Sequence, residues 1–250
     1  MKPYCYYWII IFSVVLLSRQ VYSQDSSRTS MPLLGIHFGG DLPYADLSER
    51  FGPNLCAGLA AMYKTKSNFV FGLDFNYMFG RNIKEKVLSN LTTEEDKLID
   101  NSGYPAIVNI SQRVLNFTLH GGKIWPFFSS NGNSGLITSV GIGYMQHKIH
   151  FVDLNQQIAA LNGDIRNGYD RLTNGISAFQ FVGYIYLSDN RFTNFYAGFE
   201  SYQGFTKSVR KWNYSTGTYD NKSRIDGLIG FRFGWILPLY SKAPKDYYYY

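Results

Sequence analysis

Residues 68–80 read NFVFGLDFNYMFG. Aromatic and aliphatic side chains occupy every second position from Phe69 to Phe79, and mostly small or polar residues lie between them. Successive side chains of a β-strand point to opposite faces, whereas a helix with 3.6 residues per turn would mix the two sets. This stretch therefore predicts a strand with one apolar face and one face of different character.

The same alternation recurs along the chain and predicts eight strands. They are expected at 33–40, 54–63, 69–79, 113–125, 135–147, 175–187, 192–205 and 225–237. The connections alternate in length, with longer ones at 41–53, 80–112, 148–174 and 206–224 and shorter ones at 64–68, 126–134 and 188–191. Bacterial outer-membrane barrels have short periplasmic turns and long extracellular loops, so both chain ends are predicted to be periplasmic. Within 80–112 we expect some helix, because Thr92 precedes Glu94 and Glu95 as at a helix start.

Two kinds of eight-stranded barrel fit this rhythm: a secreted, lipocalin-like barrel and a transmembrane one. Aromatic residues make up 18% of the chain and charged residues only 17%, against roughly 25% charged residues in soluble domains. Lys and Glu are nearly absent from the expected strands, although a water-facing surface normally carries many. The composition therefore favours an all-β, eight-stranded antiparallel up-and-down transmembrane β-barrel. The lipid-facing residues are predicted to include Phe71, Phe75, Phe231, Phe233 and Trp235. An aromatic girdle near the strand ends is predicted from Tyr63, Tyr77, Trp125, Tyr144 and Trp235.

The first 23 residues predict a cleaved signal peptide. Lys2 precedes an apolar stretch of about 12 residues, too short for a spanning helix, which needs roughly 20. Val21 and Ser23 suit cleavage before Gln24. The expected organisation is a signal peptide at 1–23, the barrel at 24–237 and a short periplasmic tail at 238–250, too short for a peptidoglycan-binding domain. The mature chain would keep one cysteine, Cys56, and therefore no internal disulfide.

The closing segment, residues 230–235 with the sequence GFRFGW, is similar to a barrel-assembly signal, in which a glycine is followed by alternating aromatic residues. With the signal peptide and the eight-strand rhythm, the mature chain resembles the OmpA/OmpX-like outer-membrane barrel superfamily, in the style of the barrels of Bacteroidota. The resemblance implies the fold and an outer-membrane location, while one fold hosts many functions.

The second face of the strands carries polar residues that would point into a narrow lumen. They are His37, Asp74, Asn116, His120, Glu200, Asp226 and Arg232. Glu200 and Arg232 flank the same loop at similar separations, and neither charge is cheap to bury alone, so they are predicted to pair. Asp74 and Asp226 are the alternative acids for Arg232. We therefore predict a lumen ion-pair network of Glu200, Arg232, Asp74, Asp226 and His120.

The sequence contains no motif that carries a specific chemistry. No nucleophile elbow or protease-like motif accompanies the inward His, Asp and Glu residues, so no catalytic residue is predicted. His147, His150 and Asp153 lie close together along the chain, but their spacing fits no zinc motif, and no metal or cofactor is expected. The mature net charge of +4, which is +6 less Lys2 and Arg19, is dispersed. The absence of a clustered basic patch argues against a nucleic-acid partner.

These observations favour a non-enzymatic outer-membrane protein that is either an envelope structural protein or the barrel subunit of a secretion or outer-membrane assembly machine. The alternatives are a narrow channel for small solutes and a lipid or peptide hydrolase at the barrel rim. The expected partners are outer-membrane lipid and lipopolysaccharide, and proteins that bind the extracellular loops or the tail. The charged loop segments Asp170-Arg171 and 207–212 are candidates for contacts with lipopolysaccharide phosphates.

Overall fold

The structure is a computed structural model that describes residues 28–239 except for 94–96, 130, 154–157, 162, 164, 189–191 and 211. The expected signal peptide, tail residues 240–250, and Glu94, Glu95 and Lys211 lie outside the described residues.

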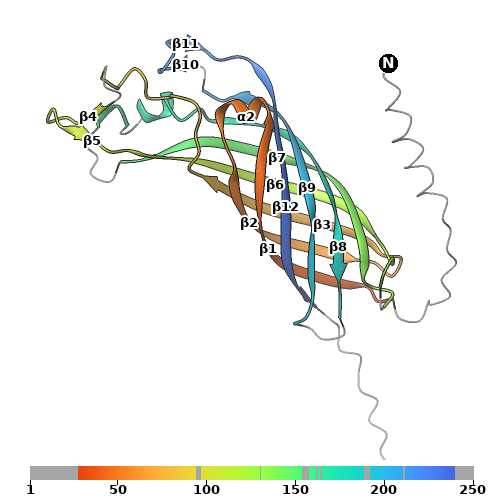
Figure 1. Cartoon of the computed structure of the whole chain (residues 1–250). Helices are drawn as coiled ribbons and strands as arrows, with labels where there is room; N and C mark the ends of the chain where they lie inside the picture. The colour runs from red at the N-terminus through yellow and green to blue at the C-terminus, as the bar shows by residue number, and fades with distance from the viewer. Residues whose placement is uncertain are drawn as a thin grey trace, which may run out of the picture.

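Eight antiparallel strands form a closed barrel in the order β1-β12-β9-β8-β7-β6-β3-β2 (Figure 1). They are β1 (Met31–Ala45), β2 (Asn54–Lys64), β3 (Phe69–Gly80), β6 (Asn109–Trp125), β7 (Gly135–Val152), β8 (Thr173–Tyr186), β9 (Phe195–Ser208) and β12 (Ser223–Pro238). Each strand pairs with the next one along the barrel, and β1 closes the ring against β12. The predicted eight-stranded up-and-down barrel is confirmed.

Most strands are longer than expected at the end that carries the long loops. The pairing of β1 with β12 continues to Ala45 opposite Asp226, and that of β6 with β7 continues to Asn109 opposite Val152. Antiparallel pairing satisfies backbone groups beyond the region of apolar alternation, which is why sequence periodicity underestimates the strand ends. As a result β1 includes Asp41, which the sequence placed in a loop.

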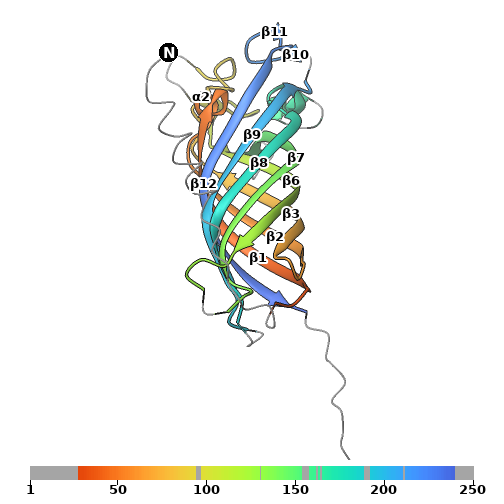
Figure 2. The same cartoon turned by 90° about the vertical axis from the view of Figure 1, so that its right-hand side faces the viewer.

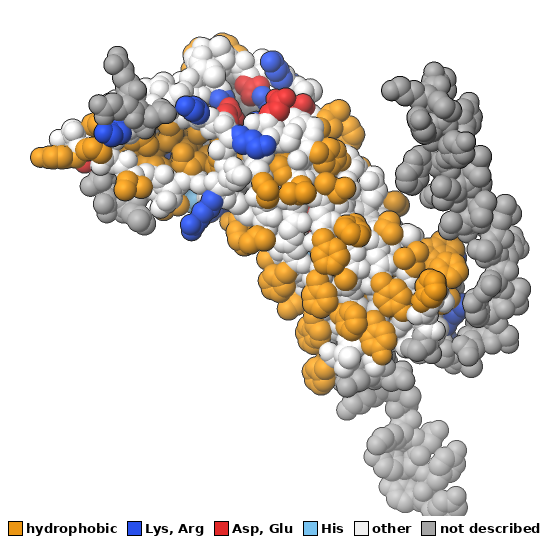
Figure 3. Space-filling view, viewed as in Figure 1, with side chains coloured by type: hydrophobic (Ala, Val, Ile, Leu, Met, Phe, Trp, Pro, Cys, Tyr) orange, Lys and Arg blue, Asp and Glu red, His pale blue; other side chains and the backbone are white. Residues whose placement is uncertain are grey.

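The outer face of the barrel is apolar. Phe71, Phe231, Phe233 and Trp235 are between 38% and 56% exposed, and Phe75 is half-buried against Phe117. The large apolar side chains cover the barrel wall, while the charged side chains gather at the end where α2 lies (Figure 3). Such a continuous exposed apolar surface is the exterior of a transmembrane barrel and would be unusual on a soluble monomer.

Among the described residues, no helix is long and apolar enough to cross a membrane.

The long connections lie at one end of the barrel and form what we call the crown, residues 46–53, 81–108, 153–172 and 209–222 (Figures 1 and 2). Its described residues form α2 (Asp46–Arg50), the strand pairs β4 (Leu98–Ile99) with β5 (Pro105–Ala106) and β10 (Trp212–Asn213) with β11 (Thr218–Tyr219), and two 3-10 turns, η1 (Ala159–Leu161) and η2 (Ile165–Gly168).

The helix expected within 80–112 is wrong for the described part of that loop. The residues form the β4–β5 hairpin instead. The Asp100 carboxylate accepts hydrogen bonds from the backbone N–H groups of Ser102 and Tyr104, each at 2.8 Å, and this local bonding closes a turn.

Candidate functional site

The lumen holds a buried group of polar side chains around one arginine, which we call the central cluster: Arg232, Glu200, Asp74, Asn76 and Tyr202. Arg232 lies on the inward face of β12 and is 2% exposed. Its Nη1 donates to Asp74 Oδ2 at 2.6 Å, and its Nη2 forms an ion pair with Glu200 and donates to Tyr202 Oη at 2.5 Å. Because Glu200 comes from the neighbouring strand β9 and Asp74 from β3, beyond β1 and β2 in the ring, the guanidinium ties two parts of the wall together across the lumen.

The wall beside this guanidinium is aromatic. Its carbon lies 5.6 Å from the ring centre of Phe179 and 5.9 Å from that of Phe181, both of which are buried. Aromatic faces attract a cation and exclude water from it. The central cluster is therefore a buried, charged site held by the barrel strands.

Asn76 extends the central cluster to a histidine. Asn76 Oδ1 lies 2.5 Å from His37 Nε2, and Asn76 Nδ2 donates to Tyr202 Oη at 3.2 Å. The other ring nitrogen of His37, Nδ1, lies 3.1 Å from the hydroxyl of Tyr196. A Cβ atom at Gly58 would come within 2.2 Å of His37 Nε2, so the glycine makes room for this ring.

His120 contacts the carboxylate oxygen of Asp74 that Arg232 does not use: His120 Nε2 lies 3.3 Å from Asp74 Oδ1. These two residues and Ser139 line a cavity of about 20 Å³. The residue types are those of a hydrolase triad, yet the volume suits a single water molecule. No substrate group fits between these side chains as they stand.

Asp226 belongs to a different site, so its assignment to the same network as Arg232 is wrong. Its Oδ1 pairs with Arg50 Nη2 at 2.6 Å and its Oδ2 with His147 Nε2 at 2.8 Å, and Thr206 donates to Oδ2. We call these four residues the upper cluster. Asp226 and Arg232 share a face of β12, but at the strand rise of ~3.4 Å per residue they lie about 20 Å apart along it.

The structure also separates the three residues weighed as metal ligands. His147 points into the lumen, while His150 lies on the outward face of β7 with Nδ1 2.9 Å from Arg166 Nη2. Asp153 accepts a hydrogen bond from the backbone N–H of Ile158 at 2.9 Å. The other inward residue singled out in the sequence, Asn116, is fully buried and accepts a hydrogen bond from Thr118.

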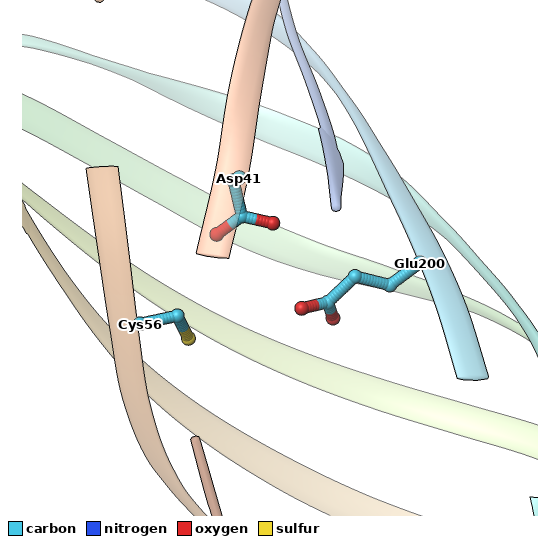
Figure 4. A group of neighbouring side chains, drawn as sticks. All are labelled: Asp41, Cys56 and Glu200. Atoms are coloured by element: carbon cyan, nitrogen blue, oxygen red, sulfur yellow. The ribbon is translucent and has the colours of Figure 1, made fainter. Parts of the chain in front are cut away.

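Several lumen residues were missed in the sequence, and two of them lie beside Glu200. They are Asp41, from the unexpected extension of β1, and Cys56, on β2 (Figure 4). Cys56 has the same inward parity as Asn54 and Gly58 and is 3% exposed, but a lone cysteine in a strand gives no signal of its partners. Only the closed barrel shows that these residues meet across the lumen.

Several charged residues in the crown and at its edge pair with one another. Arg171 pairs with Glu85 at 2.6 Å, Arg210 with Asp170 at 2.8 Å and Arg224 with Asp220 at 2.7 Å. The hydrogen bond to Asp170 raises the pKa of Arg210. Of the two segments expected to offer free charge, Asp170, Arg171 and Arg210 are already in ion pairs within the crown.

No protein-family model and no curated protein matches this chain. Among solved structures, it is similar to Ail, the attachment invasion locus protein of Yersinia pestis, at 10% identity and a TM-score of 0.41 over 83% of this chain and 99% of that one. It is also similar to the outer membrane protein OprG of Pseudomonas aeruginosa, at 11% identity and a TM-score of 0.38 over 84% and 97%. For the N-terminal β-barrel domain of OprF from the same organism the values are 12% and 0.34 over 84% and 100%.

The strand pairing of this chain itself establishes the eight-stranded barrel.

Proposed function

We propose that the chain is a non-enzymatic integral outer-membrane protein that acts through its crown and does not conduct solutes through its lumen. The observation that carries this proposal is the filled lumen. Arg232 bridges the lumen in the central cluster. Above it the upper cluster, which includes Arg50 from the first crown loop, packs against Phe51 of the same loop. The interior of an eight-stranded barrel is about wide enough for side chains to fill, and here large side chains from the strands and the first crown loop occupy it.

The proposed orientation places the crown outside the cell and the short turns in the periplasm, with cleavage of the signal peptide before Gln24. The length of the crown loops supports this orientation. Protease added to intact cells is expected to cut within 81–108, and amino-terminal sequencing of the mature protein is expected to begin at Gln24. Cleavage at 65–68 with the crown protected would reverse the orientation.

A pair of outward-facing cations supports contact with lipopolysaccharide. Arg113 on β6 and Lys148 on β7 are direct cross-strand partners. They lie on the crown side of Phe117 and Tyr144, a cross-strand pair of the apolar outer wall. Like charges directly opposite each other destabilise a strand pair, and a phosphate between them would offset that cost. We propose that they bind phosphate groups of the outer leaflet.

A second exposed feature suits a protein partner. Trp212 and Tyr219 face each other across the β10–β11 pair, with ring centres 4.8 Å apart, and they are 40% and 70% exposed. Exposed aromatic residues on a short, paired hairpin are typical anchors of protein interfaces. This feature favours a subunit of an envelope assembly over a purely structural protein.

Planar bilayers test the central claim. Wild-type protein is expected to give no stepwise conductance, and steps of a reproducible size would support the channel instead.

Mild detergent extraction tests for the protein partner and is expected to yield a complex larger than the monomer. The Trp212→Ser, Tyr219→Ser double variant should lose that complex while keeping its heat-dependent gel mobility. An Ile107→Ser variant, which alters another exposed apolar residue of the crown, serves as the control.

A further inference from the structure

Three potential metal ligands from three strands converge in the lumen. Asp41 on β1, Cys56 on β2 and Glu200 on β9 each offer one ligand atom, and these atoms all lie within 4.8 Å of one another (Figure 4). All three residues are buried, at 1%, 3% and 1% exposure. The cluster lies beside the central cluster and uses Glu200, whose Oε2 faces Arg232.

The carboxylate oxygens on this side lack partners. Both oxygens of Asp41 and Oε1 of Glu200 are buried without a hydrogen bond from the described residues. A buried carboxylate without a hydrogen bond or a counter-charge is costly. The cations nearby do not remove this cost, because Arg232 is already shared between Glu200 and Asp74.

Gly230, which has no side chain, leaves space in the lumen for these carboxylates. Gly230 on β12 is the register partner of Asp41 on one side and of Glu200 on the other. A Cβ atom at Gly230 would come within 2.1 Å of Asp41 Oδ1. Any larger residue would close the space into which the two acids point.

We propose that Asp41, Cys56 and Glu200 bind one divalent zinc ion. Thiolate and carboxylate oxygen are both zinc ligands, with bond lengths of about 2.3 Å and 2.0–2.2 Å. Tetrahedral ligands at those lengths lie about 3–4 Å apart, so side-chain shifts of about 1 Å bring the three atoms into a coordination shell. Cys56 must release its thiol proton to solvent when the ion binds, and it then gives up its 3.6 Å contact with Asn76 Oδ1. The ion neutralises the otherwise unpartnered Asp41.

Metal analysis of the mature protein, purified from membranes in detergent and equilibrated with buffered zinc, tests the proposal. Wild type is expected to retain one zinc per chain. Cys56→Ser and Asp41→Asn should each weaken zinc binding at least tenfold, because each removes one ligand with little change of shape. Asp226→Asn is the matched control: it neutralises another buried lumen carboxylate and should leave zinc binding unchanged. Heat-dependent gel mobility verifies that each variant is folded.

Cobalt binding to the wild type gives a second measurement that does not depend on folded variants. A thiolate-to-cobalt charge-transfer band is expected, and it can be assigned to Cys56 because the only other of the 2 cysteines, Cys5, lies in the expected signal peptide. Wild type that retains no zinc and shows no such band would overturn the proposal. So would equal zinc content in all variants; in either case Asp41 is neutralised by a proton instead.

Discussion

The central and upper clusters are both arginine–carboxylate sites inside one barrel, but their charges are balanced differently. In the upper cluster a single acid, Asp226, has a partner at each oxygen, from Arg50, His147 and Thr206. In the central region one arginine serves Glu200 and Asp74, and Asp41 has no partner among the described residues. In the upper cluster the buried carboxylate is compensated by its own neighbours, whereas a site with surplus acid implies a ligand or a proton.

The clusters also differ in what holds the arginine. Arg232 is part of β12, so it cannot leave the lumen without breaking strand pairing on both sides. Arg50 ends the short helix α2 in a crown loop and is 12% exposed at its side chain. Loop segments open locally at lower cost than barrel strands do. We therefore expect the central cluster to govern global stability and the upper cluster to govern local order.

Replacing the central arginine should have the largest effect. Arg232→Met keeps much of the side-chain volume but leaves Glu200 and Asp74 buried without their cation. Breaking a buried pair from one side costs about 3–5 kcal/mol. Urea unfolding in lipid vesicles measures this loss. A loss below about 1 kcal/mol would mean that lumen water screens the site and that the contrast between the clusters does not hold.

The ion pair of Arg232 with Glu200 could be predicted from the sequence. Period-two alternation indicates which residues share a face, and the shared loop indicates that Glu200 and Arg232 lie at similar depth. The same argument grouped Asp226 with Arg232, which was wrong. Parity shows that both residues point into the lumen, but it does not show which side chains from other strands or loops lie at the depth of Asp226. Arg50, the true partner of Asp226, belongs to a helix of 5 residues that no periodicity reveals.

The Asp41–Cys56–Glu200 group depends on information that no single strand contains. β1 and β2 are adjacent, but β9 reaches β1 only through β12 when the ring closes. The sequence also ended the first strand before Asp41, since the apolar alternation fades at Gly39 and Gly40. Barrel closure and cross-lumen distance are set by the tilt and stagger of the strands, which are properties of the whole sheet.

A lipid-face substitution tests whether both clusters lie inside a membrane barrel at all. Phe71, 56% exposed on the outer wall, becomes a buried charge in lipid when it is replaced by arginine. Phe71→Arg is expected to cost about 2–4 kcal/mol if the site is near the bilayer midplane. Phe71→Leu, which stays apolar, is the control for lost volume. Equal stability of the two variants in vesicle unfolding would argue for a water-facing exterior.

Removing the acid of the upper cluster should have a smaller and more local effect. Asp226→Asn leaves Arg50 without its counter-charge and gives His147 a neutral partner, but Arg50 can turn toward water. A charge-assisted hydrogen bond is worth about 1.5–3 kcal/mol, and this partial exposure places the expected loss at about 1–3 kcal/mol. Limited proteolysis should cut faster at 46–53 than in wild type, while the proteolysis pattern of the strands is unchanged. Loss of the whole barrel together with α2 would show that the two clusters are one cooperative unit.

The smallest effect is expected at the crown end of the strand that carries Arg232. Arg224 pairs with Asp220 at 2.7 Å, and their side chains are 19% and 16% exposed. Ion pairs in contact with solvent contribute about 0–1 kcal/mol, because water competes with the pair and dissolved ions screen it. Arg224→Gln should therefore lower stability by less than about 1 kcal/mol, and the difference from wild type should vanish as salt rises toward about 1 M, where the screening length is about 3 Å. The loss caused by Arg232→Met should persist at that salt concentration, since dissolved salt screens a buried ion pair much less than an exposed one. Vesicle unfolding of both variants at low and high salt separates the two behaviours, and an equal salt response would mean that the lumen around Arg232 is wet.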